Sequence, residues 1–172
     1  TSGVLRAEAA RPYAVRRPEG TTLLVQRGPD FFTEEWHVVG KDNKVTKLAL
    51  PLAIEMRGVI EGDLIIALRD DWSVAGKQFK KGDLVAVPLD QAAAGTITRA
   101  DIVYAPAETA AIQGVGVAKD AIYLDVLDNV TGKLLALRKG AKGWAAQPVD
   151  LPANGSVNIV STDGFSTDVL VN

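Results

Sequence analysis

The sequence contains no cysteine, a single histidine and a single methionine. Without cysteine the chain forms no disulfide, offers no thiolate nucleophile and has no sulfur ligand for a metal. His37 would have to serve any catalytic triad and supply any imidazole ligand. A zinc site is therefore not expected, because zinc prefers several nitrogen or sulfur ligands. The lack of cysteine leaves the compartment open between cytoplasm and periplasm.

An excess of one charge and long apolar runs are also missing. Lys and Arg total 19 and Asp and Glu total 21, which gives a formal net charge of −2. Because no basic excess exists to neutralise phosphates or anionic lipid, neither nucleic acid nor a membrane is expected as a partner. No apolar run approaches the roughly 18 residues of a membrane helix. With 47% hydrophobic and 23% charged residues among 172, the composition is that of one ordinary globular domain or two small ones.

Helix signals are nearly absent as well. The segment 91–94 predicts one helical turn, with Asp90 as its N-cap and Gly95 as its end. The segment 7–10 predicts another, ended by Pro12. No longer segment keeps apolar residues at helical spacing. An all-β fold is therefore expected.

Short apolar runs separated by turn residues extend along most of the chain. Glycine and asparagine in the intervening turns adopt the positive φ that tight hairpins need. Runs of four or five consecutive apolar residues are typical of strands covered on both faces. The runs predicted as strands are 22–25, 36–39, 45–50, 64–68, 84–87, 122–124, 134–137, 157–160 and 169–171.

Two stretches of the chain show the same order of elements. The first contains Met56-Arg57-Gly58-Val59, Asp63, the run 64–66, Asp70-Asp71, Gly82 and the run 84–87. The second contains Ile112-Gln113-Gly114-Val115, Asp120, the run 122–124, Asp128-Asn129, Gly132 and the run 134–137. The first stretch is longer because it includes a predicted hairpin over 72–79. A third copy starts at Gly155 and is cut off at Asn172.

Four-stranded units of about 40–50 residues are typical of β-propeller blades. The sequence therefore predicts an all-β partial β-propeller with about three to four blades of antiparallel strands. Its units lie at roughly 1–53, 54–110 and 111–153, with a truncated unit at 154–172. The alternative is a β-sandwich whose hairpins resemble one another.

Three segments together resemble a known family. They are Gly28-Pro29-Asp30-Phe31-Phe32 with Trp36-His37-Val38-Val39, then 68–77, then 126–134. Their order is similar to that in the N-terminal β-propeller of the prolyl oligopeptidase family, serine peptidase family S9, and most of all in its bacterial members. The similarity extends over nearly all of the chain, and its motifs are blade hairpins.

The resemblance implies a propeller of seven blades that caps an α/β-hydrolase domain carrying Ser, Asp and His. This chain would then be a non-catalytic propeller part of a prolyl-oligopeptidase-like serine peptidase. It would restrict peptide access to a hydrolase domain that is absent from this chain. A stand-alone β-rich binding or scaffold domain is the alternative function, and an independent small hydrolase is a third.

No catalytic, cofactor-binding or metal-binding residue is expected in this chain. The segment 164–168 around Ser166 is nearest to a nucleophile elbow, but it lacks the second glycine. His37 is expected on a strand face. The neighbouring carboxylates of Glu34-Glu35 and Asp70-Asp71 point to opposite faces if they lie on strands, and Asp70-Asp71 is expected to accept backbone N–H groups in a turn.

Two further motifs are interpreted as structural. Gly114-Val115-Gly116 lacks the third glycine and the following helix of a dinucleotide fingerprint. The glycosylation sequons at Asn129 and Asn154 are interpreted as hairpin turns. The aromatic residues Phe31-Phe32, Trp36 and Trp72 are expected to pack between blades, with contact to a peptide or sugar as the other interpretation.

The partners expected in the full protein are a peptide substrate and the α/β-hydrolase domain of the parent chain. The start at Thr1 suggests a processed protein or an excised piece. An open propeller also exposes an apolar blade face and an unpaired strand over 169–171. Self-association through an open blade is therefore expected.

Overall fold

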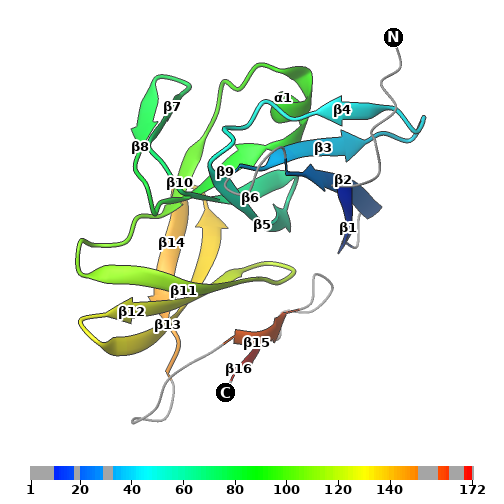
Figure 1. Ribbon diagram of the computed structural model, residues 1–172. Coiled ribbons are helices and arrows are strands. Elements are labelled where there is room, and N and C mark those ends of the chain that lie inside the picture. The colour runs from blue at the N-terminus through cyan, green and yellow to red at the C-terminus, as the bar shows by residue number, and fades with distance from the viewer. Residues whose placement is uncertain (1–9, 18–19, 29–32, 151–158, 163–168, 172) are drawn as a thin grey trace.

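Strands dominate the computed structural model, which describes residues 10–17, 20–28, 33–150, 159–162 and 169–171. They form three antiparallel sheets of four strands, one sheet of two strands and a small separate hairpin (Figure 1). The all-β prediction is confirmed. In the part of the chain that the structure describes, no helix has both the length and the apolar character needed to cross a membrane.

Each four-stranded sheet is built from strands that are close together in the chain. The first contains β1 (Ala10–Arg17), β2 (Gly20–Arg27), β3 (Glu35–Val39) and β4 (Val45–Lys47) in that order. The second contains β5 (Ile54–Ile60), β6 (Asp63–Leu68), β9 (Leu84–Pro88) and β10 (Asp101–Tyr104). The third contains β11 (Ala110–Val117), β12 (Ile122–Asp128), β13 (Thr131–Gly140) and β14 (Gly143–Pro148).

The remaining elements are short. β15 (Ile159–Thr162) and β16 (Val169–Val171) pair with each other, and β7 (Trp72–Val74) and β8 (Lys77–Phe79) form the hairpin inserted between β6 and β9. The hairpin predicted over 72–79 is therefore confirmed, and it explains why the second sheet uses more residues than the third. The one described helix, α1 (Leu89–Ala94), follows β9 directly.

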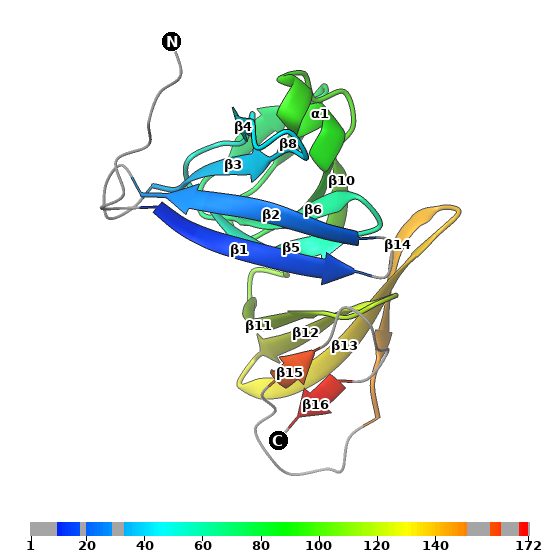
Figure 2. The same ribbon diagram turned by 90° about the vertical axis from the view of Figure 1, so that its right-hand side faces the viewer.

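The first strand of each group lies at one edge of its sheet. β1, β5 and β11 each pair with only one strand, the next along the chain. Figure 2 shows β1, β5, β11 and β15 following one another in this order, and β11 contacts both β5 and β15. We call these four the inner strands. They place the sheets side by side, as the blades of an open propeller lie.

Apolar side chains of the second sheet point alternately to its two neighbours. On β6, Leu64 and Ile66 belong to a core shared with Leu24 and Trp36 of the first sheet. Ile65, between them, belongs to the core shared with β12 of the third sheet. Period-two alternation with both faces buried explains the continuous apolar run at 64–68. The prediction of strands covered on both faces is therefore confirmed.

The third sheet is buried in the same way. Leu124 of β12 faces the second sheet. Tyr123, its neighbour, belongs to a smaller core against which Ile159 of β15 packs. The sheets are therefore joined mainly by apolar layers between neighbours, which is the packing expected of consecutive blades.

Four details of the expected elements were wrong. The helical turn predicted over 7–10 conflicts with the structure at Ala10, which begins β1, while 7–9 lie outside the described residues. Pro12 lies within β1, an edge strand that tolerates a missing N–H. The N-cap of α1 is Pro88 rather than Asp90, which lies in the first turn. The strand predicted over 45–50 is shorter than expected: β4 ends at Lys47, and the next residue, Leu48, is buried in the core.

The fourth detail concerns the repeat, in which Asp63 and Asp120 are not equivalent. Asp63 begins β6 after the two-residue turn Glu61-Gly62, and it is 2% exposed. Asp120 lies in the longer turn between β11 and β12 and is exposed. The different turn lengths shift the two stretches relative to each other. The unit boundaries given above stay a prediction.

The turn between β12 and β13 contains a residue in a strained conformation. Asn129 and Val130 both have positive φ, at 46° and 61°, which is typical of a type I′ hairpin turn. Val130 is 93% exposed, so its β-branched side chain gains little from burial. The corresponding turns Glu61-Gly62 and Ala75-Gly76 have glycine at this second position.

Val130→Gly is expected to raise the free energy of unfolding by about 1 kcal/mol, because left-handed backbone costs a non-glycine residue about 1–3 kcal/mol. Val45→Gly is a matched control, since Val45 is also an exposed valine but lies in β4. It is expected to lower the free energy of unfolding by roughly 0.5–1 kcal/mol. Urea denaturation followed by circular dichroism measures both changes. A lower midpoint for Val130→Gly would disprove the strain.

Candidate functional site

The repeated tetrapeptides of the sequence mark β-bulges on the inner strands. On β5, Met56 pairs with Ile66 and Gly58 with Ile65, so that Arg57 is an extra residue. On β11 the same irregularity falls between Ile112 and Gly114 and makes Gln113 the extra residue. β15 shows a third, between Ile159 and Ser161. Bulges bend a strand and re-aim a side chain, and they are frequent next to functional sites.

A cleft of about 440 Å³ lies between the inner strands β1 and β5. Its size is within the range of about 300–1,000 Å³ that is usual for ligand sites. β1 contributes Arg11 and Tyr13, β5 contributes Glu55 and the bulge residue Arg57, and the other lining residues are Ala14, Val15, Leu24, Gln26, Glu34, Trp36, Met56, Gly58 and Arg69. We call this space the β1–β5 cleft.

Ion pairs line the β1–β5 cleft, and one of them joins the first and second sheets. Arg69 lies 3.8 Å from Glu34 and 3.6 Å from Glu55. Glu55 also lies 3.0 Å from Nη1 of Arg57. These groups are partly exposed, so each pair contributes little to stability. Their value to the site is that they hold charged groups at the wall of a hollow.

Aromatic rings form another part of the cleft wall. The rings of Tyr13 and Trp36 are tilted with centroids 5.3 Å apart. Trp36 Nε1 donates to Glu34 at 3.1 Å, and the Tyr13 hydroxyl donates to Gln26 Oε1 at 2.9 Å. Trp36 is buried in the first core while Tyr13 is exposed. Packing between blades is therefore confirmed for Trp36, and the same residue also lines the β1–β5 cleft.

Trp72, another aromatic candidate, is not among the residues that line this cleft. Trp72 packs on Phe79 across the β7–β8 hairpin, with ring centroids 6.2 Å apart. Phe31 and Phe32 lie outside the described residues.

The paired carboxylates do not converge. Glu34 lines the β1–β5 cleft, whereas Glu35 pairs with Lys47 at 2.7 Å. Asp70 accepts the N–H of Asp71, and Asp71 accepts the N–H of Lys81 at 2.9 Å. The Lys81 N–H lowers the pKa of Asp71 from its usual value. The prediction of turn carboxylates that bind backbone N–H groups is confirmed.

The remaining motifs have simple locations. Gly114-Val115-Gly116 lies within β11, which pairs with β12. Asn129 lies in the hairpin turn that the sequence predicted. Ser166 and Asn154 lie outside the described residues. Among the residues that the structure does describe, no group of three or more His, Asp or Glu side chains is placed to hold a metal ion.

His37 lies on β3 and is 8% exposed. Its Nδ1 has no hydrogen-bond partner within the described part of the chain. Burial lowers the pKa of His37 below its usual value, although the nearby Glu35 opposes this. The expected location on a strand face is confirmed, and the ring lies in a setting that disfavours its charged form.

The pKa of His37 predicts a loss of stability in mild acid. Because the folded pKa is lowered, the unfolded chain binds the proton first as pH falls. The contribution is fully present above the unfolded pKa of about 6.5 and declines below it. The urea midpoint is expected to fall between pH 7.5 and pH 5.5, and to fall less in His37→Gln. An identical decline in the variant would show that other groups cause it.

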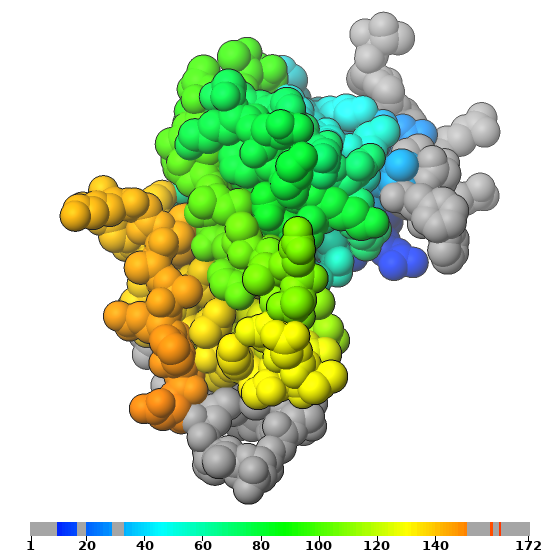
Figure 3. Space-filling model, turned by 90° about the vertical axis from the view of Figure 1, so that its left-hand side faces the viewer, coloured from blue at the N-terminus to red at the C-terminus, as the bar shows by residue number. Residues whose placement is uncertain are grey.

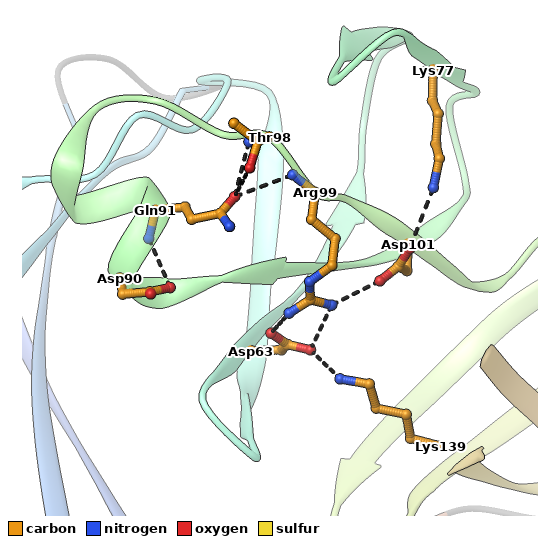
Figure 4. Close-up of polar contacts among 8 residues, drawn as sticks. All are labelled: Asp63, Lys77, Asp90, Gln91, Thr98, Arg99, Asp101 and Lys139. Atoms are coloured by element: carbon orange, nitrogen blue, oxygen red, sulfur yellow. Dashed lines mark hydrogen bonds and ion pairs between the residues drawn. The ribbon is translucent and has the colours of Figure 1, made fainter. Parts of the chain in front are cut away.

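A second polar cluster, which the sequence analysis missed, joins the second and third sheets (Figure 4). Asp63 accepts hydrogen bonds from both Nη atoms of Arg99, at 2.6 and 3.3 Å. Lys139 of β13 donates to the same carboxylate at 2.8 Å. Arg99 also binds Asp101 at 2.7 Å, and the hydrogen bonds with Asp63 and then Asp101 raise its pKa. We call Asp63, Arg99, Asp101 and Lys139 the inter-sheet ion cluster.

Helix α1 positions this cluster. Gln91 Oε1 accepts the backbone N–H of Thr98 at 2.8 Å and that of Arg99 at 3.1 Å. The loop after α1 is thereby held so that Arg99 reaches Asp63. Lys139 lies near the end of the β13–β14 hairpin, which projects from the body in Figure 3. Such contacts between distant segments leave no local signal in the sequence.

Comparisons with known proteins identify the class of protein to which this fold corresponds. No family model matches the sequence. The chain is 30% identical over 150 residues to the uncharacterized peptidase y4nA of Sinorhizobium fredii. This match covers 84% of this chain and 21% of that protein. It is 25% identical over 134 residues to the uncharacterized peptidase RP174 of Rickettsia prowazekii, covering 75% of this chain and 18% of that protein.

A solved structure shares the fold. The post-proline cleaving enzyme of Rickettsia typhi matches with a TM-score of 0.71 and 20% identity, over 83% of this chain and 21% of that one. The fold is thus that of a partial β-propeller from a peptidase. The resemblance to the prolyl oligopeptidase family is confirmed, and the chain spans about a fifth of the length of these relatives.

Proposed function

We propose that this chain is the propeller segment of a prolyl-oligopeptidase-like serine peptidase, and that it restricts peptide access to a hydrolase domain outside the given sequence. The peptide and that hydrolase domain are its partners in the full protein. The observation that carries the proposal is the row of inner strands, which belong to consecutive sheets and border a charged and aromatic cleft.

The environment of His37 supports a non-catalytic role for this chain. A general base must be able to hydrogen-bond the group whose proton it takes. His37 is buried on β3, is not among the residues that line the β1–β5 cleft, and lies where burial disfavours its charged form. Hydrolysis is accordingly assigned to residues elsewhere in the parent protein.

The proposal is tested first by the gene of the parent protein. A G-x-S-x-G motif encoded beyond Asn172 is expected, followed by the aspartate and histidine of a triad. A stop codon directly after Asn172 would contradict the proposal and favour a stand-alone binding or scaffold domain.

The second test uses the 172-residue chain alone. It is expected not to cleave proline-containing peptides, because its sequence contains no complete G-x-S-x-G motif. Cleavage that disappears in Ser166→Ala would overturn the assignment. Self-association through an open blade stays a prediction.

A further inference from the structure

The β1–β5 cleft contains one more cation than anion. Its lining includes the three arginines Arg11, Arg57 and Arg69 and the two glutamates Glu34 and Glu55. Both glutamates already contact arginine, since Arg69 reaches the two of them and Arg57 reaches Glu55. Arg11 forms no ion pair within the described residues. One further carboxylate would therefore neutralise the excess positive charge of the cleft.

Arg57 provides the donors for such a group. Its Nη1 faces Glu55 at 3.0 Å. Its Nε is buried and has no hydrogen-bond partner within the described part of the chain. Nε and Nη2 form the side of a guanidinium that binds a carboxylate through two parallel hydrogen bonds. A buried donor without a partner is unfavourable, so a ligand carboxylate that draws this side of the guanidinium into the cleft stabilises the complex.

The bulge in β5 explains why Arg57 occupies this position. Because Arg57 is the extra residue between two paired ones, it has no direct partner on β6. It lines the β1–β5 cleft and also a second hollow, of about 740 Å³, near Lys80 and Lys81. Gln113 occupies the equivalent bulge position of β11. The two stretches therefore share the bulge, but only the bulge of β5 carries a charged side chain, and that side chain lines the cleft.

The surroundings of Arg57 suit an extended peptide. β1 and β5, which border the cleft, each have one backbone edge without a strand partner in the described part. An extended segment can hydrogen-bond to such an edge. Tyr13 lines the cleft, is exposed and packs at a tilt against Trp36, so its ring is available to an apolar side chain of the same ligand.

We propose that the β1–β5 cleft binds the carboxylate of an extended peptide through Arg57 and Arg11, with Tyr13 contacting the neighbouring apolar residue. The proposal rests on the proposed function, and it makes the segment a specificity element that favours acidic side chains or free C-termini. Either source offers the same planar pair of oxygens. Arg57 is a binding residue in this role and takes no part in the chemistry.

The test measures binding to the 172-residue chain by ¹H–¹⁵N NMR. Trp36 lines the cleft and donates its indole N–H to Glu34, so its indole signal reports on ligands there. Three peptides are titrated at low salt: N-acetyl-Ala-Pro-Phe with a free carboxylate, the same peptide as its amide, and N-acetyl-Ala-Glu-Ala amide. The first and third identify the C-terminus and the acidic side chain as separate sources of the carboxylate.

A carboxylate peptide is expected to shift the Trp36 signal, and its affinity is expected to exceed that of the uncharged amide at least tenfold. Arg57→Gln is expected to weaken binding at least tenfold, and Arg11→Gln about threefold. Arg138→Gln is the matched control, because Arg138 is exposed on β13 and pairs with Asp120 at 3.6 Å. Its affinity is expected to equal that of the wild type.

Equal binding of the acid and the amide, or no binding of either, would overturn the proposal. Unchanged affinity in Arg57→Gln would do the same. The indole signals of Trp72 and Trp144 report whether that variant is folded, and if it is not, the result for Arg11→Gln decides. Because the binding is measured without a hydrolase domain, its failure leaves access restriction by the propeller untouched.

Discussion

Replacing Asp63 by alanine is expected to lower the free energy of unfolding by about 2–3 kcal/mol, because it removes charged hydrogen bonds to a buried carboxylate. Asp63 is buried and is the common acceptor for Arg99 and Lys139. Its removal leaves two cations beside each other at the contact of the second and third sheets. Guanidinium chloride unfolding, followed by tryptophan fluorescence, measures the change.

Asp120→Ala is the matched control for this experiment. The carboxylate of Asp120 is exposed and lies 3.6 Å from Arg138, so its loss is expected to cost at most about 0.5 kcal/mol. Equal effects of the two substitutions would show that the inter-sheet ion cluster does not stabilise the contact between the sheets.

Gly58→Ala is the second substitution with a large expected effect, about 2–4 kcal/mol of destabilisation. Gly58 has φ of +155°, and a Cβ built there would lie 3.1 Å from Cγ2 of Val117 on β11. The backbone conformation costs a non-glycine residue about 1–3 kcal/mol, and crowding in a packed contact costs a similar amount. The inner strands β5 and β11 would have to move apart.

Gly114→Ala tests the same position of the other repeat. Gly114 follows the bulge of β11 as Gly58 follows that of β5, but its Cβ would meet only Cβ of Asp125, at 3.5 Å. That distance is an ordinary contact, so a change within about 0.5 kcal/mol is expected. Thermal unfolding by circular dichroism compares the two variants. Similar midpoints would mean that the close approach of β5 and β11 is not required.

The fold could be predicted from the sequence where the signal was local. The continuous apolar run at 64–68 indicated a strand buried on both faces, and Leu64, Ile65 and Ile66 do point to two neighbouring sheets. β1 was missed because Pro12 is unfavourable in most strands, and only the edge position of β1 allows it.

The candidate site could not be predicted in the same way. Arg11, Glu34, Glu55 and Arg69 meet only because separate hairpins of two sheets lie side by side. The tetrapeptide at 56–59 was recognised as part of a repeat, yet its bulge depends on the pairing with β6. Pairing between strands sets which residue is extra, and the sequence of one strand does not contain that information.

Restriction of peptide access is tested most directly by the size selectivity of the parent peptidase. Its kcat/KM is measured for a short proline-containing peptide and for one of about thirty residues, in the wild type and in Lys139→Met. This variant removes the bond between β13 and Asp63 but leaves that of Arg99, and Arg138→Met serves as its control. If packed sheets exclude long peptides, Lys139→Met raises kcat/KM for the long peptide several-fold relative to the short one, and Arg138→Met does not. Equal cleavage of both lengths by the wild type, or a ratio that Lys139→Met leaves unchanged, would contradict the role in access.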